Sequence, residues 1–170
     1  MNNLEFFGLT DGCSRYADIC QHKCCQQDSA CEGDINPGNY LLIYPREMDD
    51  RGDRICSHIK IVSGNFNGGS LGFCDAKKID QSKCDIHQNY KTLDCRSYPF
   101  APAFINEKLV LIVDKRCPIV QEKELNRKNL DELYKKALLA WEQVIFKNEK
   151  AEKWIKSLNL STYELYECKK

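Results

Sequence analysis

Short apolar runs separated by turn-forming residues occupy the middle of the chain. The runs at 40–44 (YLLIY), 59–62 (IKIV) and 109–113 (LVLIV) are rich in branched and aromatic side chains. Glycine, proline or asparagine borders the first two, which is typical of short strands. The residues at 67–70 (NGGS) predict a turn after the second run. The pattern therefore predicts three strands in a small, loop-rich sheet.

A helical period follows from Asn129 onward. Apolar residues recur at every seventh position with further apolar residues beside them, as in an amphipathic helix. The repeating positions are Leu130, Ala137, Val144, Ala151 and Leu158. We expect Asn129 to cap the helix, Asp131 and Glu132 to lie at its positive end, and a break near Asn148. We expect the apolar stripe to pack on the sheet, with Trp141 and Trp154 buried; the alternative is a docking surface for a partner protein.

The expected fold class is therefore α+β, a small sheet closed by a C-terminal amphipathic helix. With 170 residues and 42% apolar content the chain is of ordinary single-domain size. We expect one domain over 1–170, with a cysteine-bearing region at 13–117 and a helical region at 122–170.

Charge and hydropathy argue against two classes of partner. The 25 basic residues balance 25 acidic ones, so there is no charge excess that would attract nucleic acid or an anionic membrane. The longest apolar run, 109–113, is too short to span a bilayer, and the opening residues lack a basic stretch followed by an apolar one. We therefore expect neither nucleic acid nor membrane as a partner, and a cytoplasmic location.

Eleven cysteines in a chain of this length are far more than ordinary usage. A disulfide framework would need an oxidising compartment, and the odd count and lack of a secretion signal speak against it. Thiols that stay reduced in the cytoplasm are instead good ligands for metal. The cysteines therefore favour a metal-binding protein, and its sheet should be organised by cysteine-bound metal.

The cysteines form two groups along the chain. The first contains Cys13, Cys20 and the doublet Cys24–Cys25. Adjacent side chains in extended backbone cannot readily point at one ion, so the doublet indicates two neighbouring sites or a multinuclear cluster. The second group consists of Cys74, Cys84, Cys95 and Cys117.

The doublet and the second group together carry a family resemblance. The doublet, followed downstream by CDIH at 84–87 and CRSYPF at 95–100, resembles the YkgJ-type cysteine-cluster family of zinc- or iron-chelating domains. The pattern is also distantly similar to that of flagellin lysine N-methylases. The resemblance implies eight ligands: Cys13, Cys20, Cys24, Cys25, Cys74, Cys84, Cys95 and Cys117. The six residues between Cys13 and Cys20 are more than is usual in the family, and Cys31 is an alternative to Cys13.

Other residues near these cysteines have simpler explanations. Cys56 and Cys168 match nothing in the pattern, and we interpret them as small hydrophobic residues. His22 and His87 are expected to be exposed and not to bind metal. Arg96 either donates hydrogen bonds to a thiolate cluster and offsets its charge, or forms a surface salt bridge.

The aromatic residues after Arg96 are expected to help enclose the metal. Tyr98, Pro99 and Phe100 should form a rigid turn that shields sulfur from water. That role is packing and not catalysis.

Four-cysteine sites suit both tetrahedral zinc and iron-sulfur clusters. Ferredoxin spacing and paired CxxC knuckles are both absent. The doublet and the long gaps favour iron-sulfur, and eight thiolates would suffice for two four-iron clusters, with zinc as the alternative.

Three functional classes remain open: a redox, electron-transfer or sensing protein; a protein-modifying enzyme of the lysine N-methylase-like kind; and a structural zinc module that binds a partner protein through its helix. No glycine-rich nucleotide loop or CxxxCxxC motif supports the enzyme. Asp75, Asp85 and Asp94 could act as general bases, but aspartates in turns usually bond the local backbone.

Overall fold

The computed structural model describes residues 40–51, 59–74 and 92–168, and its first sheet lies in the first two of these ranges. This sheet, sheet A, contains β1 (Leu41–Ile43), β2 (Ile59–Phe66) and β3 (Gly69–Cys74). All pairings are antiparallel and the order is β1-β3-β2, so β3 is central and β1 is an edge strand. A short helix, α3 (Glu47–Arg51), follows β1.

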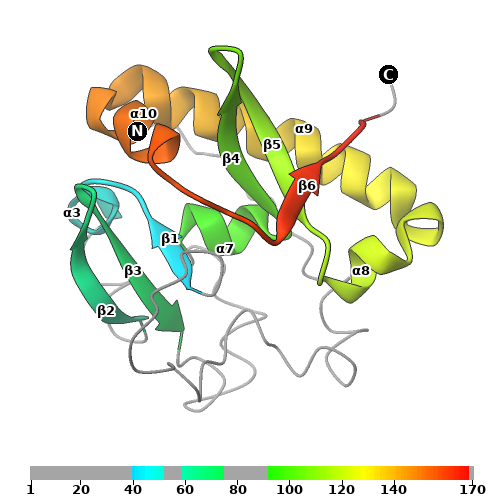
Figure 1. The fold of residues 1–170 in the computed structure, drawn as a ribbon, viewed down its shortest axis with the longest axis horizontal. Coiled ribbons are helices and arrows are strands. Elements are labelled where there is room, and N and C mark those ends of the chain that lie inside the picture. Colours follow the sequence, from blue (N-terminus) through cyan, green and yellow to red (C-terminus); the bar gives the residue numbers. More distant parts are fainter. Residues whose placement is uncertain (1–39, 52–58, 75–91, 169–170) are drawn as a thin grey trace.

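The second sheet, sheet B, lies beside the first (Figure 1). It contains β4 (Phe100–Ile105), β5 (Lys108–Asp114) and β6 (Tyr163–Leu165) in the order β4-β5-β6, again antiparallel. Asn106 and Glu107 have positive φ angles of 49° and 60° in the two-residue turn between β4 and β5. That conformation matches the twist of the two strands and closes a tight hairpin.

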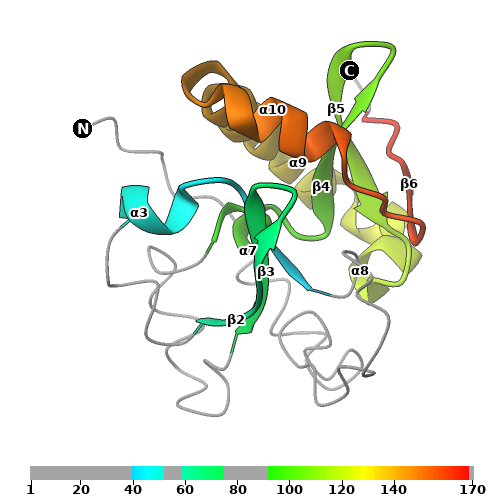
Figure 2. The ribbon, with the colours of Figure 1, turned by 60° about the vertical axis from the view of Figure 1, so that its left-hand side comes forward.

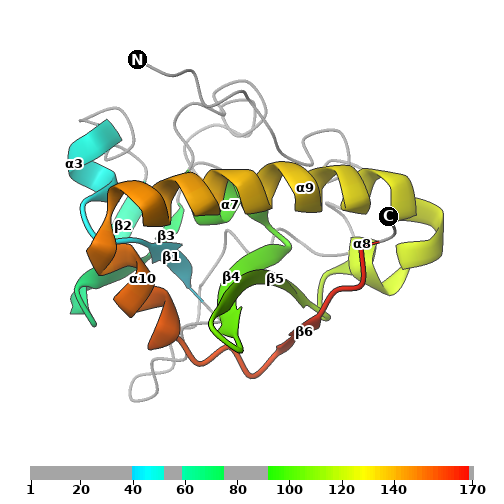
Figure 3. The same ribbon diagram turned by 90° about the horizontal axis from the view of Figure 1, so that it is seen from above.

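Helices complete a mixed α+β fold. They are α7 (Leu93–Ser97), α8 (Pro118–Gln121), α9 (Lys123–Lys147) and α10 (Glu149–Lys156). Figure 3 shows α9 as a long rod across the molecule, with α10 turning back from its end. The α+β fold class expected from the sequence is confirmed.

One main core joins the two sheets to α9. Leu42 and Leu71 from sheet A belong to the same buried cluster as Phe100, Leu111 and other residues of sheet B. Helix α9 contributes residues spaced along one face: Leu130, Leu133, Ala137, Ala140, Trp141 and Val144. The amphipathic stripe therefore packs on the sheets, as its period predicts.

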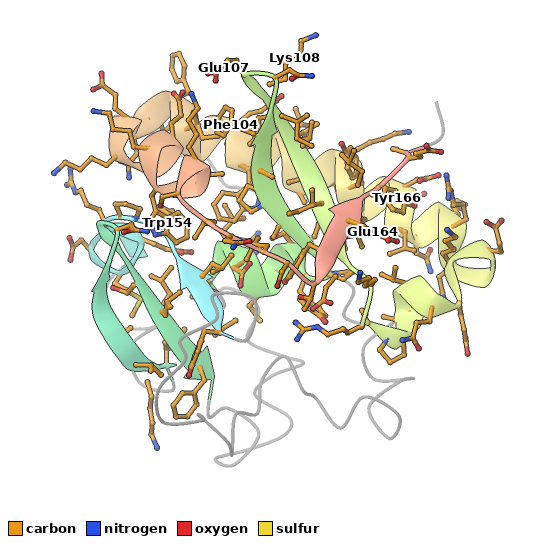
Figure 4. The ribbon with its side chains drawn as sticks, viewed as in Figure 1. Phe104, Glu107, Lys108, Trp154, Glu164 and Tyr166 are labelled. Carbon is orange, nitrogen blue, oxygen red and sulfur yellow. The ribbon has the colours of Figure 1, made fainter. Side chains whose placement is uncertain are left out.

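The two tryptophans lie at the centre of this core, and both are fully buried, as expected. Trp154 lies between α10 and sheet A (Figure 4). A Cβ atom at Gly69 would come within 2.5 Å of Trp154 Nε1 and 2.6 Å of the Ile43 carbonyl oxygen. Only glycine therefore allows the indole to approach the backbone of β3 this closely.

A second, smaller cluster lies apart from the main core and is called the small cluster below. It consists of Leu41, Ile43 and Ile59, with Met48 and Cys95 packed against it. Because successive side chains of a strand point to opposite faces, Leu42 enters the main core while its two neighbours enter the small cluster. Strand β1 is therefore apolar on both of its faces.

The three expected strands are confirmed as β1, β2 and β5, but the expectation of one small sheet is wrong, because β1 and β2 lie in sheet A and β5 lies in sheet B. The expected turn is confirmed at Asn67 and Gly68, but Gly69 and Ser70 already belong to β3. Strand β3 was not expected because Gly69 and Gly72 interrupt its apolar pattern, and β4 was not expected because Pro102 lies within it.

The helix prediction was right about the break and wrong about the start. The break is confirmed at Asn148, between α9 and α10. Helix α9, however, begins at Lys123, so the exposed Asn129 lies inside it and caps nothing, and Asp131 and Glu132 lie beyond its first turn. The first turns are mostly polar and carry no apolar period. The region 122–170 also holds β6, so it is not helical throughout.

Among the described residues, no helix is both long and apolar enough to cross a membrane.

The burial of Trp154 gives a first prediction. Trp154→Ala should lower the free energy of unfolding by about 3–5 kcal/mol, because it leaves a large cavity between α10 and sheet A. Phe146→Ala, which removes an aromatic ring that is 90% exposed on α9, should change it by less than about 0.5 kcal/mol. Urea unfolding followed by circular dichroism measures both. Equal effects of the two substitutions would contradict the described packing.

Candidate metal centre

Helix α7 carries two of the predicted site residues, Cys95 and Arg96. It contacts β1 of sheet A, β4 of sheet B and α9, and Figures 1 and 2 show it between the two sheets. Thr92 caps its start, because the Thr92 hydroxyl oxygen accepts a hydrogen bond from the Cys95 amide at 3.2 Å. The backbone of Cys95 is thereby fixed at the first turn.

Buried polar groups hold α7 from several sides. Glu47 Oε1 accepts a hydrogen bond from the Leu93 amide at 2.6 Å, and Asp94 Oδ2 accepts one from the Leu42 amide at 2.9 Å. On the α9 side, Trp141 Nε1 donates to the Ser97 hydroxyl oxygen at 3.2 Å. A five-residue helix is unstable by itself, so these bonds determine where it lies.

Asp94 has an unusual electrostatic environment. Burial raises the pKa of its carboxyl group well above the ordinary value. The hydrogen bond from Leu42 opposes this rise in pKa, whereas the negative potentials of Cys95, Glu47 and Asp114 add to it. The Asp94 carboxyl binds Leu42, 52 residues away, and not its own turn as aspartates in turns usually do.

The side chain of Cys95 is half-buried and packs against the small cluster. Cys74 is the last residue of β3, and its backbone is paired with Ile59, a member of that cluster. The structure thus brings the Cys74 backbone and the Cys95 side chain to the border of the same three apolar residues, although 20 residues separate them in the sequence.

Cys117 lies in a different place. It is 4% exposed and belongs to the main core, at the residue before α8. Its amide donates to the Asp114 carbonyl oxygen at 3.1 Å, and its own carbonyl accepts from Val120 at 2.9 Å. Cys95 and Cys117 therefore pack against separate clusters.

The remaining predicted ligands lie outside the described residues: Cys13, Cys20, Cys24, Cys25 and Cys84. The same holds for Cys31, Cys56, His22, His87, Asp75 and Asp85. In the described ranges, no three histidine, cysteine, aspartate or glutamate side chains form a group that could hold a metal ion. Cys168 is described: it is half-buried against the main core, and burial raises its pKa, as suits a small apolar residue.

Arg96 is 6% exposed, so the expectation that it forms a salt bridge at the surface is wrong.

The aromatic residues that follow Arg96 pack away from Cys95. Phe100 packs in the main core against Tyr134 and Tyr166, with ring centres 5.5 and 5.0 Å apart. The Tyr98 hydroxyl donates to Asp114 Oδ2 at 3.4 Å, and the Tyr98–Pro99 peptide is cis.

Glu47 is the residue of this region that the sequence did not indicate. It is fully buried and reaches α7 from another element, α3. A glutamate in a polar stretch after Pro45 resembles an ordinary surface residue. The turn that leads into it is also hidden in the sequence, because Arg46 adopts a positive φ of 68°, which an arginine does not indicate.

Comparison of the chain with protein-family models, curated proteins and solved structures found no match.

The geometry at Asp94 gives a second prediction. Asp94→Asn keeps a neutral oxygen acceptor for the Leu42 amide and should change the free energy of unfolding at pH 7 by less than about 1 kcal/mol. Asp94→Ala leaves that buried amide without this acceptor and should cost about 1–3 kcal/mol. Urea unfolding of both variants tests the difference. An Asp94→Ala variant as stable as Asp94→Asn would show that the bond to Leu42 contributes nothing.

Proposed function

We propose that the chain is a cysteine-ligated metal protein of YkgJ type, with an iron-sulfur cluster or zinc as cofactor and a redox, electron-transfer or sensing role. The observation that carries the proposal is that Cys95 packs against the small cluster, one member of which, Ile59, is paired through its backbone with Cys74. Both belong to the eight-cysteine pattern, and one of them lies on a helix fixed by buried hydrogen bonds. A reducing cytoplasm is the location that suits such thiols.

The donor chemistry of these positions suits a soft metal. Thiolates bind zinc and iron-sulfur clusters in preference to magnesium or calcium. Next to Cys95, the buried Arg96 places a cation on the same short helix. A guanidinium near a thiolate site can offset its negative charge and donate to sulfur.

The separation of Cys95 from Cys117 supports two sites over one. Eight thiolates divide into two sets of four, which fits two four-iron clusters or two zinc ions. When bound, a four-iron cluster would supply one-electron redox chemistry and zinc would supply a structural cross-link. The residues Leu41, Ile43 and Ile59 would exclude water from one side of Cys95.

A second candidate function is a structural zinc module that binds a partner protein through α9. One observation favours it: Leu139 is 59% exposed and Phe146 is 90% exposed. The two residues are seven positions apart and therefore lie on the same face of the helix, away from the core. Identifying the metal separates the two candidates, because zinc alone would exclude electron transfer.

The third prediction concerns metal content. The full chain purified without oxygen should contain at least about one equivalent of iron plus zinc, because four-thiolate sites retain their metal. Cys95→Ser and Cys84→Ser should each lose metal and much of the thermal stability, since such binding contributes on the order of 10 kcal/mol to folding in small metal domains. Elemental analysis and thermal unfolding give the measurements.

Cys168→Ser is the matched control. Cys168 is half-buried like Cys95 but matches nothing in the ligand pattern, so this variant should keep its metal. Less metal than about one equivalent in the wild-type chain would refute the proposal. If Cys95→Ser kept the metal while Cys168→Ser lost it, the ligand set would be wrong.

A further inference from the structure

Two buried carboxyl groups tie α7 to the β1–α3 segment. Glu47 is fully buried and Asp94 is 6% exposed. Glu47 Oε1 lies 2.6 Å from the Leu93 amide nitrogen, and Asp94 Oδ2 lies 2.9 Å from the Leu42 amide nitrogen. One bond runs from α7 to α3 and the other from β1 to α7, so the helix is held at two neighbouring points. We call this pair of bonds the α7 clamp.

The clamp acts on the edge of sheet A. Strand β1 is an edge strand, and the backbone groups on the outer side of such a strand need partners when they are buried. Asp94 supplies an acceptor to one of them, the Leu42 amide. Helix α7 therefore takes the place that a further strand would occupy.

This placement relates two predicted ligands to each other. Strand β1 pairs directly with β3, with Leu41 opposite Gly72, and Cys74 ends β3 two residues later. On the other side of β1, α7 carries Cys95, which packs against the small cluster. The clamp and the pairing of β1 with β3 together set the position of Cys95 relative to the end of β3.

Burying two carboxyl groups is costly, and apolar residues of similar size would often give a more stable protein. Directed hydrogen bonds, unlike apolar contacts, fix both the distance and the orientation of the elements that they join. The clamp therefore contributes positional precision that simple burial of apolar groups at Glu47 and Asp94 would not supply.

We propose that Glu47 is a positioning residue of the metal centre, which holds α7 so that Cys95 lies where a thiolate-bound metal requires it. This inference rests on the proposed function. A thiolate already in place loses little freedom on binding, whereas one on a loosened helix must first be ordered. Residues that orient metal ligands typically contribute 10- to 100-fold to metal affinity, roughly the effect expected here.

The test compares three substitutions of Glu47 in the full chain, reconstituted anaerobically with Co²⁺ or Zn²⁺. Glu47→Gln keeps an oxygen that accepts from Leu93 and should bind both metals within about threefold of the wild-type affinity. Glu47→Leu fills the space without an acceptor and should bind roughly 10- to 100-fold more weakly, with altered thiolate-to-Co²⁺ charge-transfer bands. Competition with a chelator gives the affinities.

A control for general loss of stability is Val144→Ala. Val144 is buried in the main core on α9, and it takes no part in the clamp. This variant should be less stable than the wild type and yet keep the wild-type affinity and Co²⁺ spectrum. If it lost affinity as Glu47→Leu does, the effect at Glu47 would be one of stability and the inference would be overturned.

Glu47→Asp covers the case in which Glu47→Leu does not fold. It keeps the carboxyl group but withdraws it from Leu93 by one methylene, so affinity should again fall. Wild-type affinity and spectrum in Glu47→Asp, or in a folded Glu47→Leu, would overturn the inference. Failure of the wild-type chain itself to bind either metal would instead refute the proposed function, and the inference with it.

Discussion

The structure depends on the placement of α7, a helix too short to be stable without external partners. Five residues form barely more than one turn, and the free energy of nucleating such a turn is unfavourable. Hydrogen bonds accepted by the side chains of Thr92, Glu47 and Asp94 offset that cost at one end of the helix, and Trp141 donates one to Ser97 at the other. Because α7 contacts β1, β4 and α9, its position also fixes how the two sheets meet on α9.

The same helix separates the two apolar clusters. Leu93 is fully buried in the main core, whereas Cys95, two residues later, packs against the small cluster. A half-buried cysteine at that boundary is sheltered on one side by Leu41, Ile43 and Ile59. Partial shelter of this kind lowers the local dielectric constant and strengthens any electrostatic interaction of the sulfur.

Apolar periodicity predicted those elements whose residues are continuously apolar or regularly amphipathic. Strands β1, β2 and β5 and the break at Asn148 follow from local pattern alone. Strands β3 and β4 could not be predicted in this way, because Gly69 is required by the close approach of Trp154 and Pro102 lies within a strand. Strands β3 and β4 therefore both depend on contacts with other parts of the chain and not on their own apolar pattern. The first turns of α9 are polar as well, and they are helical because they continue a helix whose later residues pack in the core.

For the candidate site, the sequence indicated cysteines but not the groups that hold them. Cys95 and Cys74 were identified by spacing and resemblance, and their proximity to one cluster depends on the register of Ile59 with Cys74. Glu47 could not be recognised, because its importance lies in a hydrogen bond across 46 residues. A single glutamate carries no periodic signal, and only the folded chain shows that its side chain is buried.

Cys95 and Cys117 pack against separate clusters, yet polar groups around the buried Asp114 connect the chain segments that carry them. Asp114 accepts hydrogen bonds from the Tyr98 hydroxyl group and, through its backbone carbonyl, from the Cys117 amide. Its own amide donates to the Pro99 carbonyl oxygen at 2.9 Å, and its carboxylate pairs with Arg116 at 2.7 Å. The turn before α8 is thus fixed to the chain that leaves α7. Asp114 therefore fixes Cys117 relative to the chain that leaves the Cys95-bearing helix, so the two thiols are held in a constant relation although they pack against separate clusters.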